Sequence, residues 1–144
     1  FSGSLFLRDS RPEVRESLRK RELAVLESPQ DMAAMAEKVR VFVHHGGIGT
    51  CETVLALGRP QVIFPRHAEQ RMNAATLIRA RVAMIAPEGN DVDAAEVIQK
   101  IRAFIDDPRP HKHAREIATA LAQQDHSSVA IVADACERLV AGTR

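Results

Sequence analysis

Short apolar runs alternate with longer amphipathic stretches along the chain as far as residue 85. Five runs are rich in β-branched or other apolar residues, at positions 5–7, 23–26, 39–43, 61–64 and 82–85. Each run is short enough to be a buried strand rather than a helix. Helical patterns separate the later runs, at 31–38, 50–57 and 69–80. The alternation predicts right-handed βαβ crossovers, and therefore a Rossmann-like, doubly wound α/β fold with a parallel sheet.

The C-terminal part of the chain is expected to be helical throughout. Asp93 is a predicted N-cap because Glu96 follows three residues later, and Val92 is placed to pack against Val97 as a hydrophobic staple. One apolar stripe follows and ends at 107–108; its members are Ile98, Ile101 and Ile105. The last predicted helix has a second stripe, made of Val129, Val132, Ala133, Cys136, Leu139 and Val140. Cys136 is therefore expected to be a small core residue rather than a reactive thiol.

Length and composition narrow the classes of function. The 144 residues, of 15.9 kDa, fit a single domain with a core of its own. Lys and Arg together number 20 against 19 Asp and Glu, and this balance, a formal net charge of +1, argues against nucleic-acid binding. Aromatic residues make up 3%, with no Trp or Tyr, so base-stacking platforms are not expected either.

Targeting signals and cysteine spacing give the expected compartment. No apolar run approaches the length of a membrane span, and no signal-peptide pattern opens the sequence. Cys51 and Cys136 lie far apart without ligand spacing, which is typical of free thiols in a reducing compartment. We therefore expect a cytoplasmic protein without a membrane span.

A glycine-rich turn, His-His-Gly-Gly-Ile-Gly-Thr at 44–50, joins a predicted strand to a predicted helix. Ligands of open α/β sheets bind beyond the carboxyl ends of the strands, where helix N-termini present free N–H groups. Glycines let the backbone approach a ligand closely, and a helix N-terminus with a histidine and a hydroxyl beside it suits a phosphate. A strand-to-helix turn needs glycine in any case, however, so the turn alone leaves phosphate binding and a purely structural turn both open.

The adjacent histidines, His44 and His45, are not expected to hold a metal. Neighbouring residues of a strand point to opposite faces, so the two rings cannot chelate one ion together. No carboxylate or cysteine stands nearby at ligand spacing, and the zinc signatures are absent.

A second polar cluster follows the next predicted strand. The apolar run 61–65 leads into a loop, and Glu69 and Gln70 then open a helix that also carries Asn73. Successive parallel strands place their C-terminal loops side by side, so this pair is expected close to the glycine-rich turn. A carboxylate beside an amide suits sugar hydroxyls, although Glu69 taken alone is better explained as a favourable first-turn acid.

Taken together, segments 27–30, 41–50, 58–65 and 69–74 resemble the donor-binding box of the UDP-glycosyltransferases, which have the GT-B fold. This family includes plant secondary-metabolite enzymes, glucuronosyltransferases and bacterial macrolide or antibiotic glycosyltransferases. The spacing from Gln30 to Gln70 is kept without a gap. The resemblance implies that the fold is one half of a GT-B enzyme and that the ligand is a nucleotide diphosphate sugar with UDP or dTDP, without a further cofactor.

The resemblance also implies roles residue by residue. His45 is similar to the histidine that contacts the donor diphosphate. Gly47, Gly49 and Thr50 are similar to the backbone and hydroxyl groups around the same phosphates.

The remaining implied roles concern the sugar and the nucleoside. Glu69 and Gln70 resemble the acid–amide pair that binds hydroxyls of the transferred sugar, and Gln30 matches the residue that helps to hold the nucleoside. Two positions depart from the family pattern. Glu27 stands where plant members often have a base-stacking Trp, and Thr53 stands where many members have a ribose-binding Glu. The choice between UDP and dTDP is therefore open.

The family's enzymes have two domains, with the acceptor and a general base on the N-terminal one. We expect residues 1–144 to be the C-terminal donor-binding domain, incomplete at its N-terminus, without the acceptor domain and without a catalytic residue of its own. His67, His111 and His113 are expected at solvated loop positions rather than as that base. The isolated chain is expected to be inactive and able to associate with itself through the face that the absent segments would cover.

The expected parent protein is a hexosyltransferase that acts on a small-molecule acceptor. Two alternatives stay open from the sequence. One is an N-acetylglucosamine transferase of the peptidoglycan type, and the other is a stand-alone nucleotide-sugar-binding subunit that acts with a partner chain.

Overall fold

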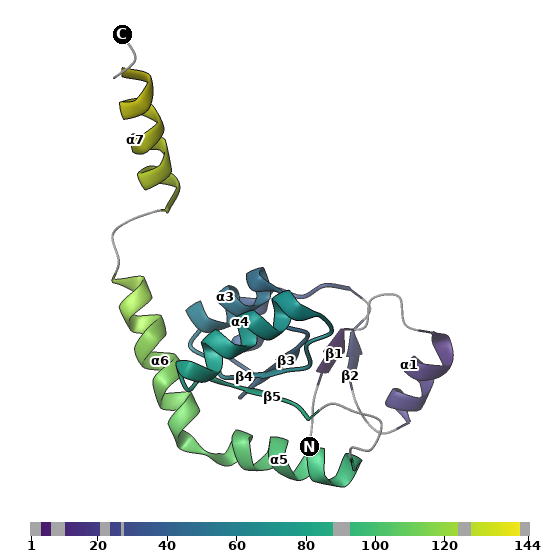
Figure 1. The fold of residues 1–144 in the computed structure, drawn as a ribbon. Coiled ribbons are helices and arrows are strands. Elements are labelled where there is room, and N and C mark those ends of the chain that lie inside the picture. Colours follow the sequence, from purple (N-terminus) through teal and green to yellow (C-terminus); the bar gives the residue numbers. More distant parts are fainter. Residues whose placement is uncertain are drawn as a thin grey trace.

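The structure is a computed structural model that describes residues 4–6, 11–20, 24–26, 28–87, 93–123 and 128–141. Strands and helices alternate up to residue 85, and helices follow (Figure 1). The elements are β1 (Ser4–Phe6), α1 (Pro12–Arg19), β2 (Ala24–Leu26), α2 (Met32–Ala36), β3 (Phe42–His44), α3 (Ile48–Ala56), β4 (Gln61–Ile63), α4 (Ala68–Arg79), β5 (Ala83–Ile85), α5 (Ala94–Asp106), α6 (Pro108–Ala122) and α7 (Ser128–Ala141). A strand overlaps each of the five apolar runs, although β1 begins one residue before its run and β3 ends one residue after its run. The predicted number and order of strands are confirmed among the described residues.

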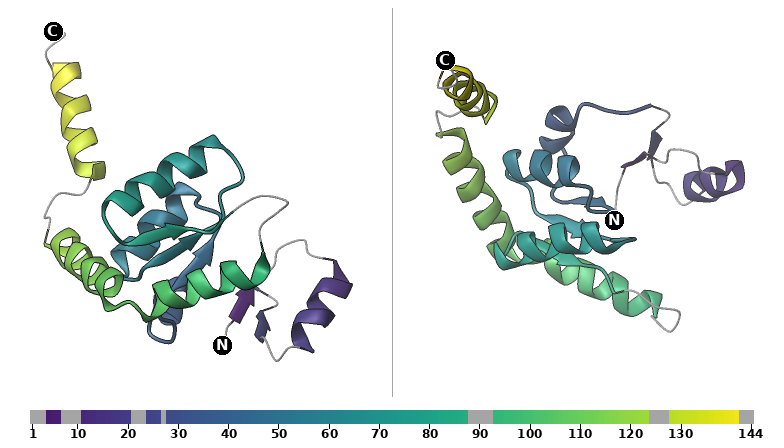
Figure 2. Two further views of the ribbon diagram at one scale, coloured as in Figure 1. Left: turned by 60° about the horizontal axis from the view of Figure 1, so that its bottom comes forward. Right: turned by 45° about the horizontal axis from the view of Figure 1, so that its top comes forward.

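The strands form two parallel sheets. β1 pairs with β2, while β4 lies between β3 and β5 in a second sheet. α3 and α4 connect the strands of the second sheet and cover one of its faces, whereas α5 follows the last strand and lies on the other side of the sheet (Figures 1 and 2). The expected parallel α/β architecture is confirmed, with the sheet divided in two among the described residues.

The core lies between the second sheet and helices α3, α4 and α6. All three residues of β4 are buried, because this strand has a neighbour on each side and helices over its faces. Val62 and Ile63 are fully buried, and side chains of this size each stabilise the fold by about 1.5–3 kcal/mol on burial. The cluster around Ile63 continues into the helices through Cys51, Ala74, Leu77 and Ala114.

The edge of β3 away from β4 is open among the described residues. Phe42 N–H donates to Pro60 O, and Phe64 N–H donates to His44 O, so the ladder to β4 uses Phe42 and His44. Backbone groups of successive strand residues point to opposite edges, so the N–H and C=O of Val43 face the open edge. The Val43 side chain is also 58% exposed, which is unusual for a valine within a sheet.

Helix α1 was not among the predicted helices. Pro12 at its first position and Glu13 in its first turn are typical helix-start residues and could have indicated it. The apolar periodicity did not, because Val14 and Leu18 are the only large apolar residues of this helix.

The helical C-terminal part is confirmed, and side chains of aspartates begin its first two helices. Asp93 accepts a hydrogen bond from Ala95 N–H at α5, and Asp107 accepts one from Arg109 N–H at α6. The proposed staple residue Val92 lies outside the described residues. Ile101 and Ile105 of the predicted stripe are half-buried, whereas Ile98 is exposed.

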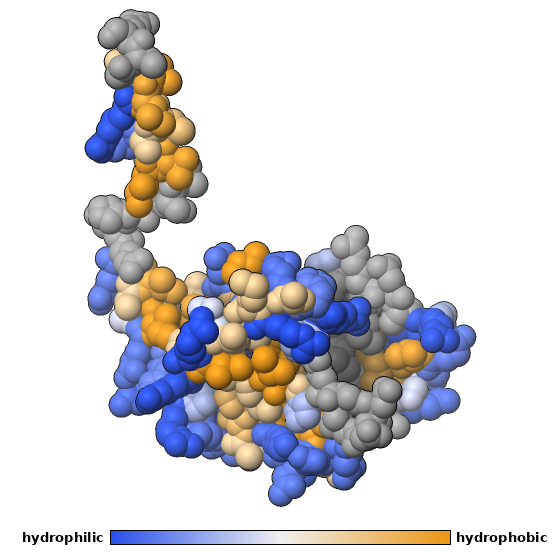
Figure 3. Space-filling model, viewed as in Figure 1, coloured by the Kyte–Doolittle hydropathy of each residue, from blue (hydrophilic) through white to orange (hydrophobic). Residues whose placement is uncertain are grey.

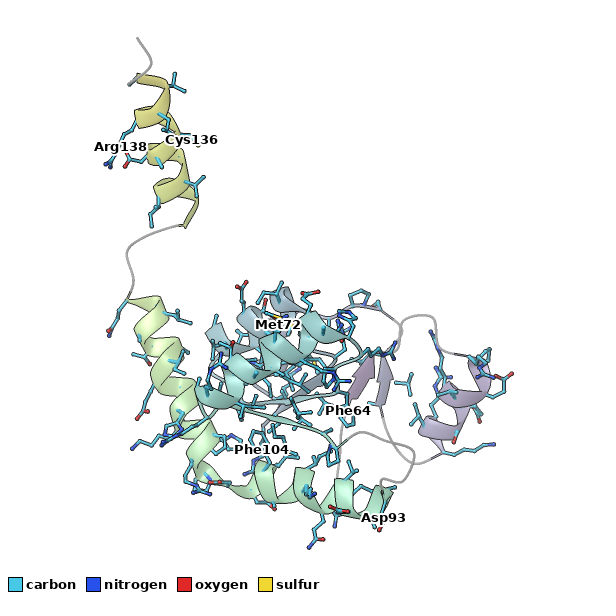
Figure 4. All side chains as sticks on the ribbon, viewed as in Figure 1. Phe64, Met72, Asp93, Phe104, Cys136 and Arg138 are labelled. Atoms are coloured by element: carbon cyan, nitrogen blue, oxygen red, sulfur yellow. The ribbon has the colours of Figure 1, made fainter. Side chains whose placement is uncertain are left out.

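Helix α7 stands apart from the rest of the described chain (Figures 1 and 2). Apolar side chains run along it in the open (Figure 3), including Ile131, Val132, Leu139 and Val140. Cys136 is exposed on this helix (Figure 4), so the prediction of a core position is wrong. Periodicity indicates that a helix has an apolar face, but it does not say which surface covers that face.

No helix among the described residues is long and apolar enough to cross a membrane.

Candidate functional site

The candidate site lies at the carboxyl ends of β3 and β4, as the sequence predicts. His44 pairs with Ile63 at the end of the parallel register. The two strands therefore release their following loops side by side, one into α3 and the other into α4. Asn73 of α4 crosses this gap and donates from Nδ2 to Gly46 O at 3.0 Å. The glycine-rich turn and the start of α4 are thus held together by a direct hydrogen bond.

Gly46 has the one backbone conformation in the turn that requires glycine. Its φ is +90°, and a Cβ there would lie 2.8 Å from Ile63 Cγ2 and 3.2 Å from Gln70 O. A side chain would be strained by both the dihedral angle and the contact. The chain can therefore reverse tightly over the end of β4 only at a glycine.

His45, Gly47, Gly49 and Thr50 are brought together at the N-terminus of α3. The first N–H groups of an α-helix have no intrahelical partner. Gly47 is the N-cap of α3 and has no side chain that could accept a hydrogen bond from them. The exposed imidazole of His45 folds over this end: its Nε2 lies 2.9 Å from where a Cβ of Gly47 would be. A Cβ on Gly49 would meet nothing within 4 Å. This arrangement of free donors, an imidazole and open space suits an anion.

His44 turns the other way, into the protein, and sequence reasoning missed its role. Its Nδ1 accepts a hydrogen bond from Gly46 N–H at 3.0 Å, and its Nε2 lies 2.8 Å from Oε1 of Gln61. Gln61 is fully buried and donates from Nε2 to Cys51 O at 3.0 Å. Burial lowers the pKa of His44, the bond to Gln61 opposes this shift, and the charge of His45 adds to it. The feature of the sequence that could have indicated this role is Gln61, a polar residue at the start of a run of buried apolar residues.

Glu69 and Gln70, the predicted sugar-binding pair, behave differently. Glu69 is exposed in the first turn of α4, with its Oε1 3.5 Å from Asn73 Nδ2. Gln70 is buried, and its Oε1 accepts a 2.7 Å hydrogen bond from Arg66 N–H. The side-chain oxygen of Gln70 is therefore engaged in closing the β4–α4 loop. The carboxylate of Glu69 is open to solvent.

Gln30 makes its hydrogen bonds within its own loop. Its Nε2 donates to the carbonyl oxygen and hydroxyl of Ser28, at 3.0 and 3.3 Å. Glu27, the position compared with the base-stacking Trp, lies outside the described residues. Thr53 donates its hydroxyl hydrogen to Gly49 O at 2.7 Å, so its oxygen can still accept a hydrogen bond one turn into α3.

The three other histidines considered in the sequence divide into two cases. His67 is an exposed N-cap of α4, as a solvated position should be. His111 and His113 lie within α6 rather than in loops, and His111 is buried with Nε2 2.9 Å from Ile105 O. The prediction of solvated loops is wrong for this pair, because α6 packs against α3 and turns these positions inward.

Within the described part of the chain, no group of three or more His, Cys, Asp or Glu residues is placed to hold a metal ion. His44 and His45 have different partners, since one ring contacts Gln61 and the other lies over Gly47.

Comparison with known proteins identifies the family. The profile of the erythromycin biosynthesis protein CIII-like C-terminal domain matches residues 26–139, and the chain belongs to this family. UDP-glycosyltransferase UGT5 of Dactylopius coccus is 33% identical over 91 residues, which is 62% of this chain and 17% of that protein. UDP-glycosyltransferase CGT of Oryza sativa subsp. japonica is 28% identical over 100 residues, 65% of this chain and 21% of that protein.

Solved structures share the fold. Spinosyn forosaminyltransferase SpnP matches 96% of this chain with a TM-score of 0.72 at 22% identity, over 34% of its own length. SsfS6 of Streptomyces sp. SF2575, in complex with thymidine diphosphate, matches 84% of the chain with a TM-score of 0.60 at 25% identity, over 37% of its own length. The fold is that of one half of a GT-B glycosyltransferase, and the resemblance seen in the sequence motif is confirmed.

Proposed function

We propose that this chain binds the nucleotide diphosphate part of a sugar donor, and that its parent protein transfers a hexosyl group from a UDP- or dTDP-sugar to a small-molecule acceptor. The observation that carries the proposal is the exposed His45 imidazole over the free N-terminus of α3, beside the open space at Gly49. The family membership supports the same function.

In this proposal the N-terminus of α3 and His45 receive the diphosphate. Negative charge on the diphosphate grows as the bond to the sugar breaks, so fixed donors at this point stabilise the transition state more than the ground state. Gly47, Gly49 and Thr50 surround the phosphates, and the carboxylate of Glu69 accepts hydrogen bonds from sugar hydroxyls. Gln70 contributes its remaining amide hydrogens, since its oxygen is held by Arg66 N–H.

We assign the nucleoside end to Gln30 and Thr53 and leave the base as uracil or thymine. Related structures carry either nucleotide: LpCGTa was solved with UDP, and VinC with dTDP. Each is 18–19% identical to this chain and supports the fold rather than the choice of base.

The chain covers between 17% and 29% of the curated relatives it matches. We propose that residues 1–144 are the C-terminal donor-binding half, that a further strand pairs with the open edge of β3, and that the acceptor and its general base belong to another domain. The exposed Val43 and the division of the sheet support the missing strand. Where no further strand covers the open edge of β3, we expect the isolated chain to associate with itself through that edge.

Amide hydrogen exchange tests the missing strand. In residues 1–144, the Val43 amide should exchange much faster than those of Phe42 and His44, and a longer chain should protect it. Equal protection of the three amides in residues 1–144 would contradict the open edge.

One relative supports a second candidate function. The UDP-N-acetylglucosamine–N-acetylmuramyl-(pentapeptide) pyrophosphoryl-undecaprenol N-acetylglucosamine transferase of Lawsonia intracellularis is 31% identical over 107 residues, 65% of this chain and 29% of that protein. Under this alternative, the donor would be UDP-N-acetylglucosamine.

Calorimetric titration with UDP, dTDP, GDP and inorganic phosphate tests the proposed function. We expect UDP or dTDP to bind more tightly than phosphate, and His45→Ala to lose about tenfold or more of this affinity. His67→Ala is the matched control, because His67 is an exposed histidine at the same edge of the sheet and no binding role is assigned to it. Equal affinity for phosphate and both nucleotides, unchanged in His45→Ala, would reject the site. Transfer of sugar by the isolated chain would reject the division between two domains.

A further inference from the structure

A chain of three hydrogen bonds runs beneath the glycine-rich turn. It starts at Gly46 N–H, passes through the imidazole of His44 and the amide of Gln61, and ends at Cys51 O. Gly46 precedes the N-cap of α3, and Cys51 lies one turn into the helix. The two ends of this hydrogen-bond chain therefore hold the backbone on both sides of the start of α3.

The chemistry of the two ends sets the direction of every bond. A backbone N–H can only donate, so Nδ1 of His44 has to be the bare acceptor. A carbonyl can only accept, so Gln61 presents its NH₂ to Cys51 O and its oxygen to His44. Nε2 of His44 then carries the ring's single proton and donates it to Gln61 Oε1. Only the neutral ring in this tautomer satisfies all three bonds.

A second proton on His44 would conflict with this arrangement. Nδ1–H and Gly46 N–H would be two donors facing each other across 3.0 Å. Gly46 has little room to move away, because its carbonyl is bound to Asn73 and Ile63 fills the space beside it, 2.8 Å from where a Cβ would be. The cation of His44 is therefore incompatible with the observed turn.

Among the described residues, His45 is the titratable group whose charge acts on His44. His45 lies in the same turn, and its positive charge would oppose a second one on His44. β4 contributes Gln61, which is uncharged, and α3 contributes the carbonyl of Cys51, whose thiol has a pKa raised by burial. On α4, the carboxylate of Glu69 is near Asn73.

We propose that His44 is a positioning residue of the phosphate-binding turn, and that Gly46 N–H and Gln61 together hold it in the neutral tautomer in which it acts. The inference rests on the proposed function, because the element positioned is the anion-binding end of α3. His44 does not touch the ligand in this proposal. It fixes Gly46, and with it the direction of the free N–H groups that follow Gly47.

The first test reads the tautomer without any nucleotide. In ¹⁵N-labelled protein, two-bond ¹H–¹⁵N correlations of the imidazoles should show His44 protonated at Nε2 and bare at Nδ1. In the Gln61→Leu variant Gly46 N–H still donates to Nδ1, so this tautomer should persist, while the Nε2–H resonance should shift because it has lost its acceptor. A wild-type His44 protonated at Nδ1, or cationic at neutral pH, would overturn the proposal whatever the nucleotide does.

The second test uses substitutions at His44 with UDP as the probe. His44→Phe keeps a ring but removes the acceptor, and we expect about tenfold weaker UDP binding. In His44→Asn the side-chain oxygen can occupy the position of Nδ1, so this variant should recover most of the affinity. Thermal unfolding of both variants separates loss of binding from loss of the fold. Equal UDP binding by wild-type protein and a folded His44→Phe variant would overturn the positioning role.

The two tests separate the two proposals. If wild-type protein shows the expected tautomer but binds neither UDP nor dTDP, the proposed function fails while the hydrogen-bond chain is confirmed, and the positioning role is overturned with the site it serves. If UDP binds and depends on His45 but not on His44, only the positioning role fails.

Discussion

The imidazole of His45 lies directly over Gly47, with Nε2 2.9 Å from the position that a Cβ of Gly47 would occupy. The glycine therefore makes room for the histidine rather than for a special backbone angle, since Gly47 has an ordinary φ of −62°. The neighbouring Gly46 is different, because its φ of +90° requires glycine on its own account.

Alanine at these two glycines should separate binding from stability. Gly47→Ala should displace the His45 ring and weaken UDP binding about tenfold, with a change in unfolding free energy under about 1 kcal/mol. Gly46→Ala should destabilise the fold by about 2–4 kcal/mol, through its positive φ and its contact with Ile63. Urea unfolding and calorimetric titration of both variants check this. Similar stability losses in the two variants would contradict the distinction.

Gly49→Ala should raise stability while it lowers binding. A Cβ at Gly49 meets nothing within 4 Å, and replacing glycine by alanine inside a helix stabilises it by about 0.5–1 kcal/mol. If the diphosphate occupies this open space, the added methyl group should weaken UDP binding. A variant that is more stable and binds UDP as tightly as the wild type would place the phosphates elsewhere.

Substitutions at the adjacent residues Glu69 and Gln70 should affect different properties, sugar binding for Glu69 and stability for Gln70. Gln70→Leu leaves Arg66 N–H without its partner, which should cost about 1–2 kcal/mol in urea unfolding. Glu69→Gln removes an exposed charge, and its stability should change by less than about 1 kcal/mol. Under the proposed function, Glu69→Gln should weaken the binding of UDP-glucose but not of UDP. Equal weakening of both ligands would argue against contact with the sugar.

His44 should make the free energy of unfolding fall as the pH is lowered. Burial places its folded-state pKa below the ordinary value of 6.5, so the folded state favours the neutral ring more than the unfolded state does. The stabilisation is fully present above pH 6.5 and is lost as pH falls from there through the folded-state pKa. Urea unfolding across this range should show a steeper loss for wild-type protein than for His44→Asn. Identical slopes would mean that another group is responsible.

The sequence by itself determined the elements and the edge of the sheet at which the site lies. Apolar periodicity acts over a few residues, so 61–64 could be recognised as a buried strand without knowledge of its neighbours. Parallel βα units also bring the ends of consecutive strands to one edge, so the turn that contains His45 and the helix that begins with Glu69 could be expected side by side. The helix α1 escaped this reasoning because its apolar face consists of Val14 and Leu18 alone, which is too short a stripe to reveal it.

Only the tertiary structure decided which way individual polar side chains turn and what covers each apolar face. His44 bonds to Gln61, 17 residues away, and His111 is buried because α6 packs against α3. Gln70 turns inward to Arg66 N–H instead of outward beside Glu69. The stripe of α7 predicts a buried Cys136, yet that residue is exposed. Such outcomes depend on partners that are distant in the sequence, and a local pattern of apolar and polar residues carries no information about them.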